Sequence, residues 1–179
     1  MLREPATHPD TALYTEHGSG LPLIAGFFSY RSVDAVIAEL SAQGATPQRR
    51  TLARPPSSDY PTHVLDTLSV DAYALLGTQG RLTLEFFNDR LYEVDFKPQD
   101  AKACATALRK LDPQLRRDRN GRSEHVDGER RVVTNVDLAF SSVGQSLGTE
   151  PYVLWQDKRL VQQRDDWDRR FGAIPYSVK

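Results

Sequence analysis

Two stretches of the chain carry apolar residues at the spacing of an amphipathic helix, i, i+3, i+4 and i+7. In the first stretch these residues are Val33, Val36, Ile37 and Leu40. Ser32 stands where an N-cap is expected, and Gly44 stands where a glycine commonly ends a helix. In the second stretch, 68 positions further on, they are Ala101, Cys104, Ala105 and Leu108, with Asp100 as the expected cap. The pattern therefore predicts two helices in the same register.

Strand-like runs follow the first predicted helix. A polar run at 46–53 is a weak strand candidate, whereas residues 67–76 alternate apolar and polar side chains as a half-buried strand does. Two further runs, 81–87 and 91–97, are separated by Asn88, Asp89 and Arg90. Residues of these types between two strand-like runs indicate a β-hairpin.

Comparable runs follow the second predicted helix. The polar run at 114–126 is again weak, and residues 134–141 alternate like a strand. Residues 152–156 precede a turn at 157–159, and a last strand is expected from Leu160 onwards. Corresponding features of the two halves lie 66 to 69 positions apart, which indicates an internal duplication.

The expected fold is α+β. Two tandem α-β-β-β(-β) units would form one continuous antiparallel sheet with both helices packed on one face, because one helix is too narrow to cover such a sheet. The expected division of the chain is a polar N-terminal tether (1–22), a first repeat unit (23–98), a second repeat unit (99–168) and a C-terminal tail packing on the core (169–179).

Composition narrows the classes of function. The 179 residues are 39% hydrophobic and carry a formal net charge of −1, so the chain can bury a core of its own, and a duplex nucleic-acid binder is not expected. Cys104 is the single cysteine and is expected in the core; the four histidines show no ligand spacing. We therefore predict no metal and no cofactor. No apolar run is long enough for a membrane span.

A family resemblance is carried by two segments. GFFSYRSVDAVIAEL at 26–40 and the hairpin RLTLEFFNDRLYEVDF at 81–96 resemble the repeat unit of BamE-like envelope lipoproteins and the tandem unit of the β-lactamase inhibitor protein. The resemblance covers residues 27–96 and, more faintly, 100–166. It implies a non-catalytic protein-binding module of the bacterial envelope that uses a concave sheet face. The first residues lack the charged-then-apolar pattern of a signal peptide, so none is expected within this sequence. The compartment stays open: periplasm or outer membrane if an export signal was trimmed, cytoplasm otherwise.

Strand parity predicts which side chains lie on the free face of the sheet. If Leu82, Leu84 and Phe86 face the helices, their neighbours face away, and the same rule turns Leu91 outward and Tyr92 inward. The candidate binding residues on this face are Asp71, Tyr73, Glu85, Phe87, Glu93, Asp95 and Tyr152. A mixture of aromatic and charged side chains is typical of a protein-binding surface, although singly exposed residues on an amphipathic sheet would look the same.

The expected register also places Glu85 opposite Glu93, which is unfavourable for two like charges. Three explanations stay open: a different register, compensation by Arg81 or Arg90, or two carboxylates held together for chemistry. The last would raise one pKa, as a general acid requires, and makes a paired-carboxylate hydrolase the alternative to a binding module. No catalytic residue is assigned.

Two basic segments allow alternative interpretations. The arginine-rich run at 109–131 is interleaved with acidic residues and is expected as a solvated edge of the sheet; the alternative is contact with RNA or an acidic partner. Near the C-terminus, Trp167, Phe171, Ile174 and Tyr176 could form a lid over the core. Trp167 and Phe171 could equally anchor a partner, together with neighbouring arginines.

Overall fold

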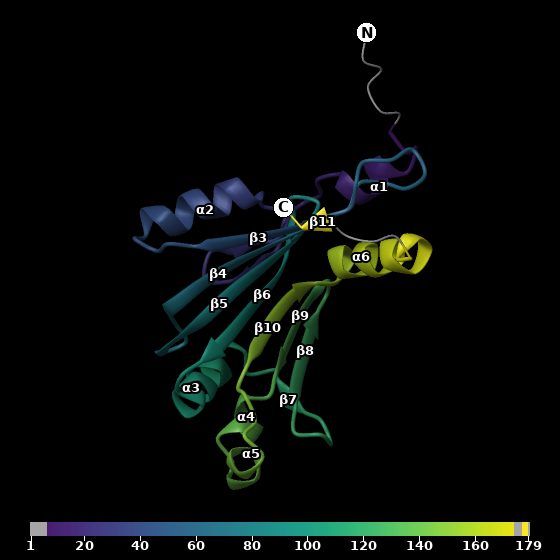
Figure 1. Cartoon of the computed structure of the whole chain (residues 1–179). Helices are drawn as coiled ribbons and strands as arrows, with labels where there is room; N and C mark the ends of the chain where they lie inside the picture. The colour runs from purple at the N-terminus through teal and green to yellow at the C-terminus, as the bar shows by residue number, and fades with distance from the viewer. Residues whose placement is uncertain (1–6, 174–176, 179) are drawn as a thin grey trace.

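The computed structural model describes residues 7–173 and 177–178, which form an α+β fold around one large antiparallel sheet (Figure 1). The strand order is β11-β3-β4-β5-β6-β10-β9-β8-β7, and each neighbouring pair is antiparallel. The strands are β3 (Gln48–Ala53), β4 (Val64–Leu75), β5 (Thr78–Phe87), β6 (Leu91–Pro98), β7 (Arg116–Arg117), β8 (Ser123–Asp127), β9 (Arg130–Thr134), β10 (Val153–Asp157) and β11 (Ser177–Val178).

Short elements and helices complete the fold. A separate two-stranded ribbon is formed by β1 (Pro22–Ile24) and β2 (Phe27–Phe28). The helices are α1 (Thr11–Thr15), α2 (Val33–Ala42), α3 (Ala101–Leu111), α4 (Val136–Ala139), α5 (Ser142–Ser146) and α6 (Lys158–Phe171). In the described part of the chain, no helix has both the length and the apolar character that crossing a membrane requires.

The two helices predicted from apolar spacing are α2 and α3, and both begin at the expected caps. The Ser32 side chain accepts a hydrogen bond from the backbone N–H of Ala35 (3.3 Å), and Asp100 accepts one from Ala103 (2.9 Å). Gly44 ends α2 with φ +82°, and the next N–H donates to the Leu40 carbonyl (3.0 Å), as in a Schellman motif.

The predicted hairpin is the β5–β6 connection, with a tighter turn than expected. Asn88 (φ +50°) and Asp89 (φ +60°) form a two-residue turn in the left-handed region. The register then shifts by one residue at the start of β6, so Leu91 faces the main core and Tyr92 the opposite face. The orientations expected for Leu91 and Tyr92 were therefore wrong, because alternation alone does not include a bulge.

Two expected strands are helices. Residues 134–141 leave the sheet after Thr134, whose hydroxyl donates to the Tyr152 carbonyl (2.6 Å), and continue as α4 and α5. The final strand expected from Leu160 is α6, with the Asp157 side chain as its N-cap (3.0 Å to the N–H of Arg159). The offset that relates the two halves of the sequence therefore does not extend to these segments.

Hydrophobic side chains gather in two clusters. The main core contains side chains of α2, α3, the β1–β2 ribbon and the strands β4, β5, β6, β9 and β10. The second core lies where α1 and α6 meet the β5–β6 hairpin, and its buried members are Tyr14, Phe87, Tyr92, Leu160 and Trp167. Figure 1 shows α6 continuing from the end of β10 toward α1.

The N-terminal segment, expected as a tether, packs through the fully buried Tyr14 in the part that the structure describes, from residue 7. Arg90 attaches this segment to the hairpin. Its guanidinium is buried and donates to the backbone carbonyls of Tyr14 and Glu16 and to the side chain of Gln163 on α6 (2.9 Å for each of the last two). Three distant segments therefore converge on one turn.

Candidate functional site

The candidate site is the side of the sheet turned away from the main core, here called the open face. Thr67, Glu85, Glu93 and Gln156 are successive cross-strand partners on β4, β5, β6 and β10. They lie on the open face because residues adjacent to them in the strands, such as Leu68, belong to the main core. Four strands thus contribute one polar row across the middle of the sheet.

Hydrogen bonds connect the members of this row. Thr67 Oγ1 donates to Glu85 Oε2 (2.8 Å), and Gln156 Nε2 donates to Glu93 Oε2 (2.5 Å). Arg131 on β9 donates to the other end of the Gln156 amide (3.3 Å). The two glutamates are therefore held in defined positions, each by a neutral donor.

Asp95 adds a third carboxylate, two residues further along β6. It pairs in register with Thr83 on one side and Leu154 on the other. Its Oδ1 is buried and has no hydrogen-bond partner among the described residues. Burial raises the pKa of Asp95 to about 6, and the neighbouring charge of Glu93 acts in the same direction.

The two glutamates are also shifted toward the protonated state. Burial raises the pKa of Glu85 to about 7, the bond from Thr67 opposes the shift, and the charges of Glu93 and Asp95 add to it. Burial likewise raises the pKa of Glu93, against the bond from Gln156. Burial thus shifts all three neighbouring acids toward their protonated forms.

Compensation for these charges comes from α6. Neither arginine considered from the sequence supplies it, since Arg81 pairs with Asp71 (2.8 Å) and Arg90 binds backbone carbonyls. Arg164 instead lowers the pKa values of both glutamates through its charge. Its guanidinium donates to the hydroxyl of Tyr92 (2.9 Å) and pairs with Asp165 (2.7 Å).

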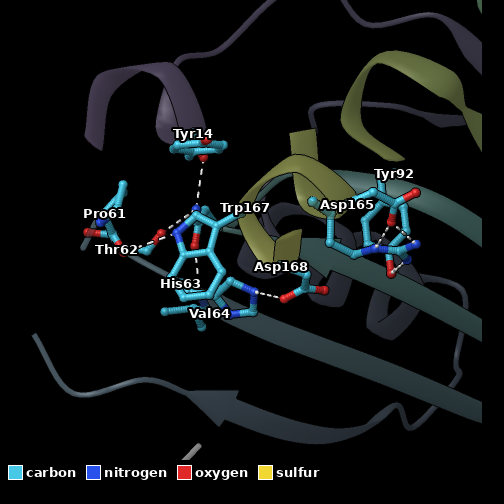
Figure 2. Close-up of polar contacts among 11 residues, drawn as sticks. Tyr14, Pro61, Thr62, His63, Val64, Tyr92, Asp165, Trp167 and Asp168 are labelled. Atoms are coloured by element: carbon cyan, nitrogen blue, oxygen red, sulfur yellow. Dashed lines mark hydrogen bonds and ion pairs between the residues drawn. The ribbon is translucent and has the colours of Figure 1, made fainter. Parts of the chain in front are cut away.

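The aromatic candidates at the hairpin end are covered. Phe87 and Trp167 are both fully buried in the second core, and the Trp167 indole donates to the Pro61 carbonyl (3.2 Å; Figure 2). His63 lies against the Trp167 ring, with 4.0 Å between ring centroids, and the Phe171 ring centroid lies 5.3 Å from that of Trp167. This geometry matches a lid more closely than an exposed anchor. Ile174 and Tyr176 lie outside the described residues.

Asp71, Tyr73 and Tyr152 do not join the acidic centre. The β4 register is irregular between Val70 and Tyr73, where Ala72 has φ +54°, and Tyr73 turns toward the main core. Its hydroxyl donates to Gln43 on the far side of the sheet (3.3 Å). Asp71 is exposed in its ion pair, and Tyr152 precedes β10, held by its backbone to Asn135 (2.8 Å). Parity fails at Tyr73 because of the bulge.

The remaining candidates from the sequence are the single cysteine, the histidines and the arginine-rich run. Burial raises the pKa of the Cys104 thiol to about 12, consistent with a core side chain. Within residues 7–173 and 177–178, no three histidine, cysteine or acidic side chains form a metal-ligand set. The arginine-rich run supplies β7, which is the last strand at one edge of the sheet.

No protein-family model matches this chain, and no curated protein matches it. A row of fixed carboxylates with raised pKa values can bind cationic or hydrogen-bond-donating groups, and a protonated carboxyl beside an ionised one can also transfer a proton.

Proposed function

We propose that this protein is a non-catalytic protein-binding module whose open face receives a basic segment of another protein. The observation that carries the proposal is the contiguous placement of Glu85, Glu93 and Asp95 on the open face, where none of the three belongs to either hydrophobic core. Ionised carboxylates at these positions repel one another. A lysine or arginine side chain from a partner would remove this repulsion and give the partner a fixed register.

The architecture supports the proposal through its symmetry. We infer that α2 with β3–β6 and α3 with β7–β10 are two copies of one unit, with both helices on one face of the sheet. In support, the strands on one side of the β6–β10 pair follow as β6, β5, β4 and β3, and those on the other side follow as β10, β9, β8 and β7. In addition, α2 and α3 both contribute side chains to the main core. This arrangement leaves the open face at the junction of the units, where the three carboxylates lie. The envelope location implied by the family resemblance belongs to the same proposal.

The test begins with capture of partners from an extract of the source cells and ends with binding between two purified proteins. We expect Glu93→Gln and Asp95→Asn each to lower the affinity for the captured partner by about tenfold, because each substitution removes one charge-assisted contact. Asp34→Asn is the matched control, since Asp34 is exposed on α2 with 92% of its side chain accessible. Equal affinities for all four proteins would contradict the proposal.

The pH dependence of the same binding reaction provides an independent check. A partner's cation favours ionised carboxylates, so binding should release protons and be tighter at pH 8 than at pH 5.5. This follows from the raised pKa values of Glu85 and Asp95, about 7 and about 6. Affinity that is the same at both pH values would argue against contact with these groups.

A second candidate function is a hydrolase that uses the same acids. It is favoured by one observation, the direct pairing of Glu85 with Glu93 together with the pKa of about 7 for Glu85, which suits a general acid at neutral pH. A panel of nitrophenyl glycosides tests it. Turnover by the wild-type protein that disappears in both Glu85→Gln and Glu93→Gln would favour the hydrolase, whereas capture of a partner without turnover favours the binding module.

A further inference from the structure

A second site, unrelated to the open face, lies on the main-core side of the sheet near its β7 edge. A cavity of about 290 Å³ is bounded by the C-terminal half of α3 and by residues of β7, β8 and β9. Its apolar wall includes Ala105, Leu108, Leu115 and Val136. The volume is at the lower end of the range for small-molecule sites, so the cavity suits a compact ligand.

Two polar side chains of the cavity have no partner. Arg117 and Ser123 are direct cross-strand neighbours on β7 and β8, and both line the cavity. Ser123 is only 5% exposed, and its hydroxyl makes no hydrogen bond within the described residues. The Arg117 guanidinium is exposed and makes no hydrogen bond or ion pair within the same residues. Both side chains line the cavity and can donate hydrogen bonds to a ligand there.

The other charges of the cavity are already compensated. The Asp112 carboxylate, 5% exposed, contacts Nδ1 of His125 at 2.8 Å, and Nη1 of Arg130 lies 3.9 Å away. Asp137 forms an ion pair with Arg109. Arg117 is therefore the one charge of the cavity lining left without an opposite charge in the described structure, and the cavity favours a negatively charged ligand.

We propose that this cavity binds a small organic carboxylate with a compact apolar body. The carboxylate accepts hydrogen bonds from the Arg117 guanidinium and the Ser123 hydroxyl, and the body of the ligand packs on Ala105, Leu108 and Val136. Arginine suits this role because its planar guanidinium presents two parallel donors to a carboxylate. The inference does not depend on the open face, because the two sites lie on opposite sides of the sheet.

The experiment titrates the full chain with phenylacetate and follows the backbone amide signals of Leu108, Ser123 and Val136 by NMR. Phenylacetamide is the neutral ligand of the same shape, and inorganic phosphate tests an anion without an apolar body. We expect saturable shifts with phenylacetate and at least tenfold weaker binding of the other two, since one charge-assisted contact or the apolar contact is lost.

Variants locate the binding. Arg117→Gln should lower the affinity for phenylacetate by about tenfold, and Ser123→Ala should lower it by a smaller factor. Arg119→Gln is the control, since Arg119 is exposed and outside the cavity lining. If Ser123→Ala does not fold, Arg117→Gln decides alone, because Arg117 is exposed and its replacement leaves the core intact. Absence of saturable shifts, equal binding of phenylacetate and phenylacetamide, or equal affinity of Arg117→Gln and the wild type would each overturn the proposal.

Discussion

Glu85 on β5 and Glu93 on β6 are direct cross-strand partners on the open face of the sheet. Each accepts a hydrogen bond from a neutral side chain, Thr67 for Glu85 and Gln156 for Glu93, and neither has an ion pair within 4.0 Å in the described residues. Two acids placed in this way destabilise the fold when both are ionised. The arrangement therefore has measurable consequences for stability as well as for binding.

The first prediction concerns Glu85 and pH. An acid whose pKa is raised on folding holds its proton more tightly in the folded state, so the free energy of unfolding falls as pH rises from 4.5 through about 7. Glu85→Gln should remove this loss, raising the free energy of unfolding at pH 8 on the order of 1 kcal/mol and leaving it nearly unchanged at pH 4. Urea unfolding at both pH values measures the difference. A variant less stable than wild type at pH 8 would count against the raised pKa.

His63 should have the opposite effect on stability. Its ring is buried, and burial, together with the charge of Arg54, lowers its pKa from 6.5 to about 4. The unfolded chain then binds the proton first, so stability is complete above pH 6.5 and is lost as pH falls toward 4. His63→Gln should show a flatter dependence in this window, by on the order of 1 kcal/mol. Because the substitution also changes packing, the test compares the slope of the free energy of unfolding against pH in the two proteins. An unchanged slope would contradict the lowered pKa of His63.

Trp167 should be essential for stability. Its indole is fully buried in the second core, donates to the Pro61 carbonyl (3.2 Å) and lies under the Arg54 guanidinium, 4.7 Å from the ring centroid. Trp167→Ala should lower the free energy of unfolding by about 3–5 kcal/mol, and Trp167→Phe by clearly less. Circular dichroism in urea measures both. A loss below about 1 kcal/mol with Trp167→Ala would favour the partner-anchor interpretation instead.

The Asn88 turn should be sensitive to side-chain chemistry. The Asn88 amide donates to the carbonyls of Tyr14 (2.8 Å) and Thr62 (2.9 Å) and accepts from the N–H of Val64 (2.7 Å), with the backbone at φ +50°. Asn88→Ala loses these bonds and adds backbone strain, whereas Asn88→Gly loses the bonds alone. We expect losses of about 3–4 and about 2–3 kcal/mol respectively. Thermal unfolding ranks the stabilities of the two variants. An Asn88→Ala variant that is more stable than Asn88→Gly would contradict the turn geometry.

Local patterns predicted α2, α3 and the β5–β6 hairpin. The apolar spacing and caps of the two helices, and the turn residues at 88–90, lie close together in sequence, so they are visible without tertiary information. The bulge before Glu93 is not visible, because it follows from the two-residue turn and shifts only the register of β6. That shift explains why Leu91 and Tyr92 were assigned to the wrong faces.

The α6 segment shows where sequence interpretation failed. Leu160, Trp167 and Phe171 are spaced as one face of a helix, but the polar residues between them and the supposed offset favoured a strand. In the candidate site, parity found the three carboxylates. It missed Gln156 and Arg131, because their approach depends on the pairing of β10 with β6 and β9, which joins residues far apart in sequence.

Site-specific photo-crosslinking in the source cells tests most directly whether the open face is the binding surface. A photoreactive phenylalanine replaces Thr83, which pairs with Asp95 on the open face, or Thr106, which is exposed on α3 behind the sheet. Both variants are first checked for the wild-type unfolding midpoint. The account predicts a discrete protein adduct from position 83 and none from position 106. An adduct from position 106 alone, or from neither position, would contradict it.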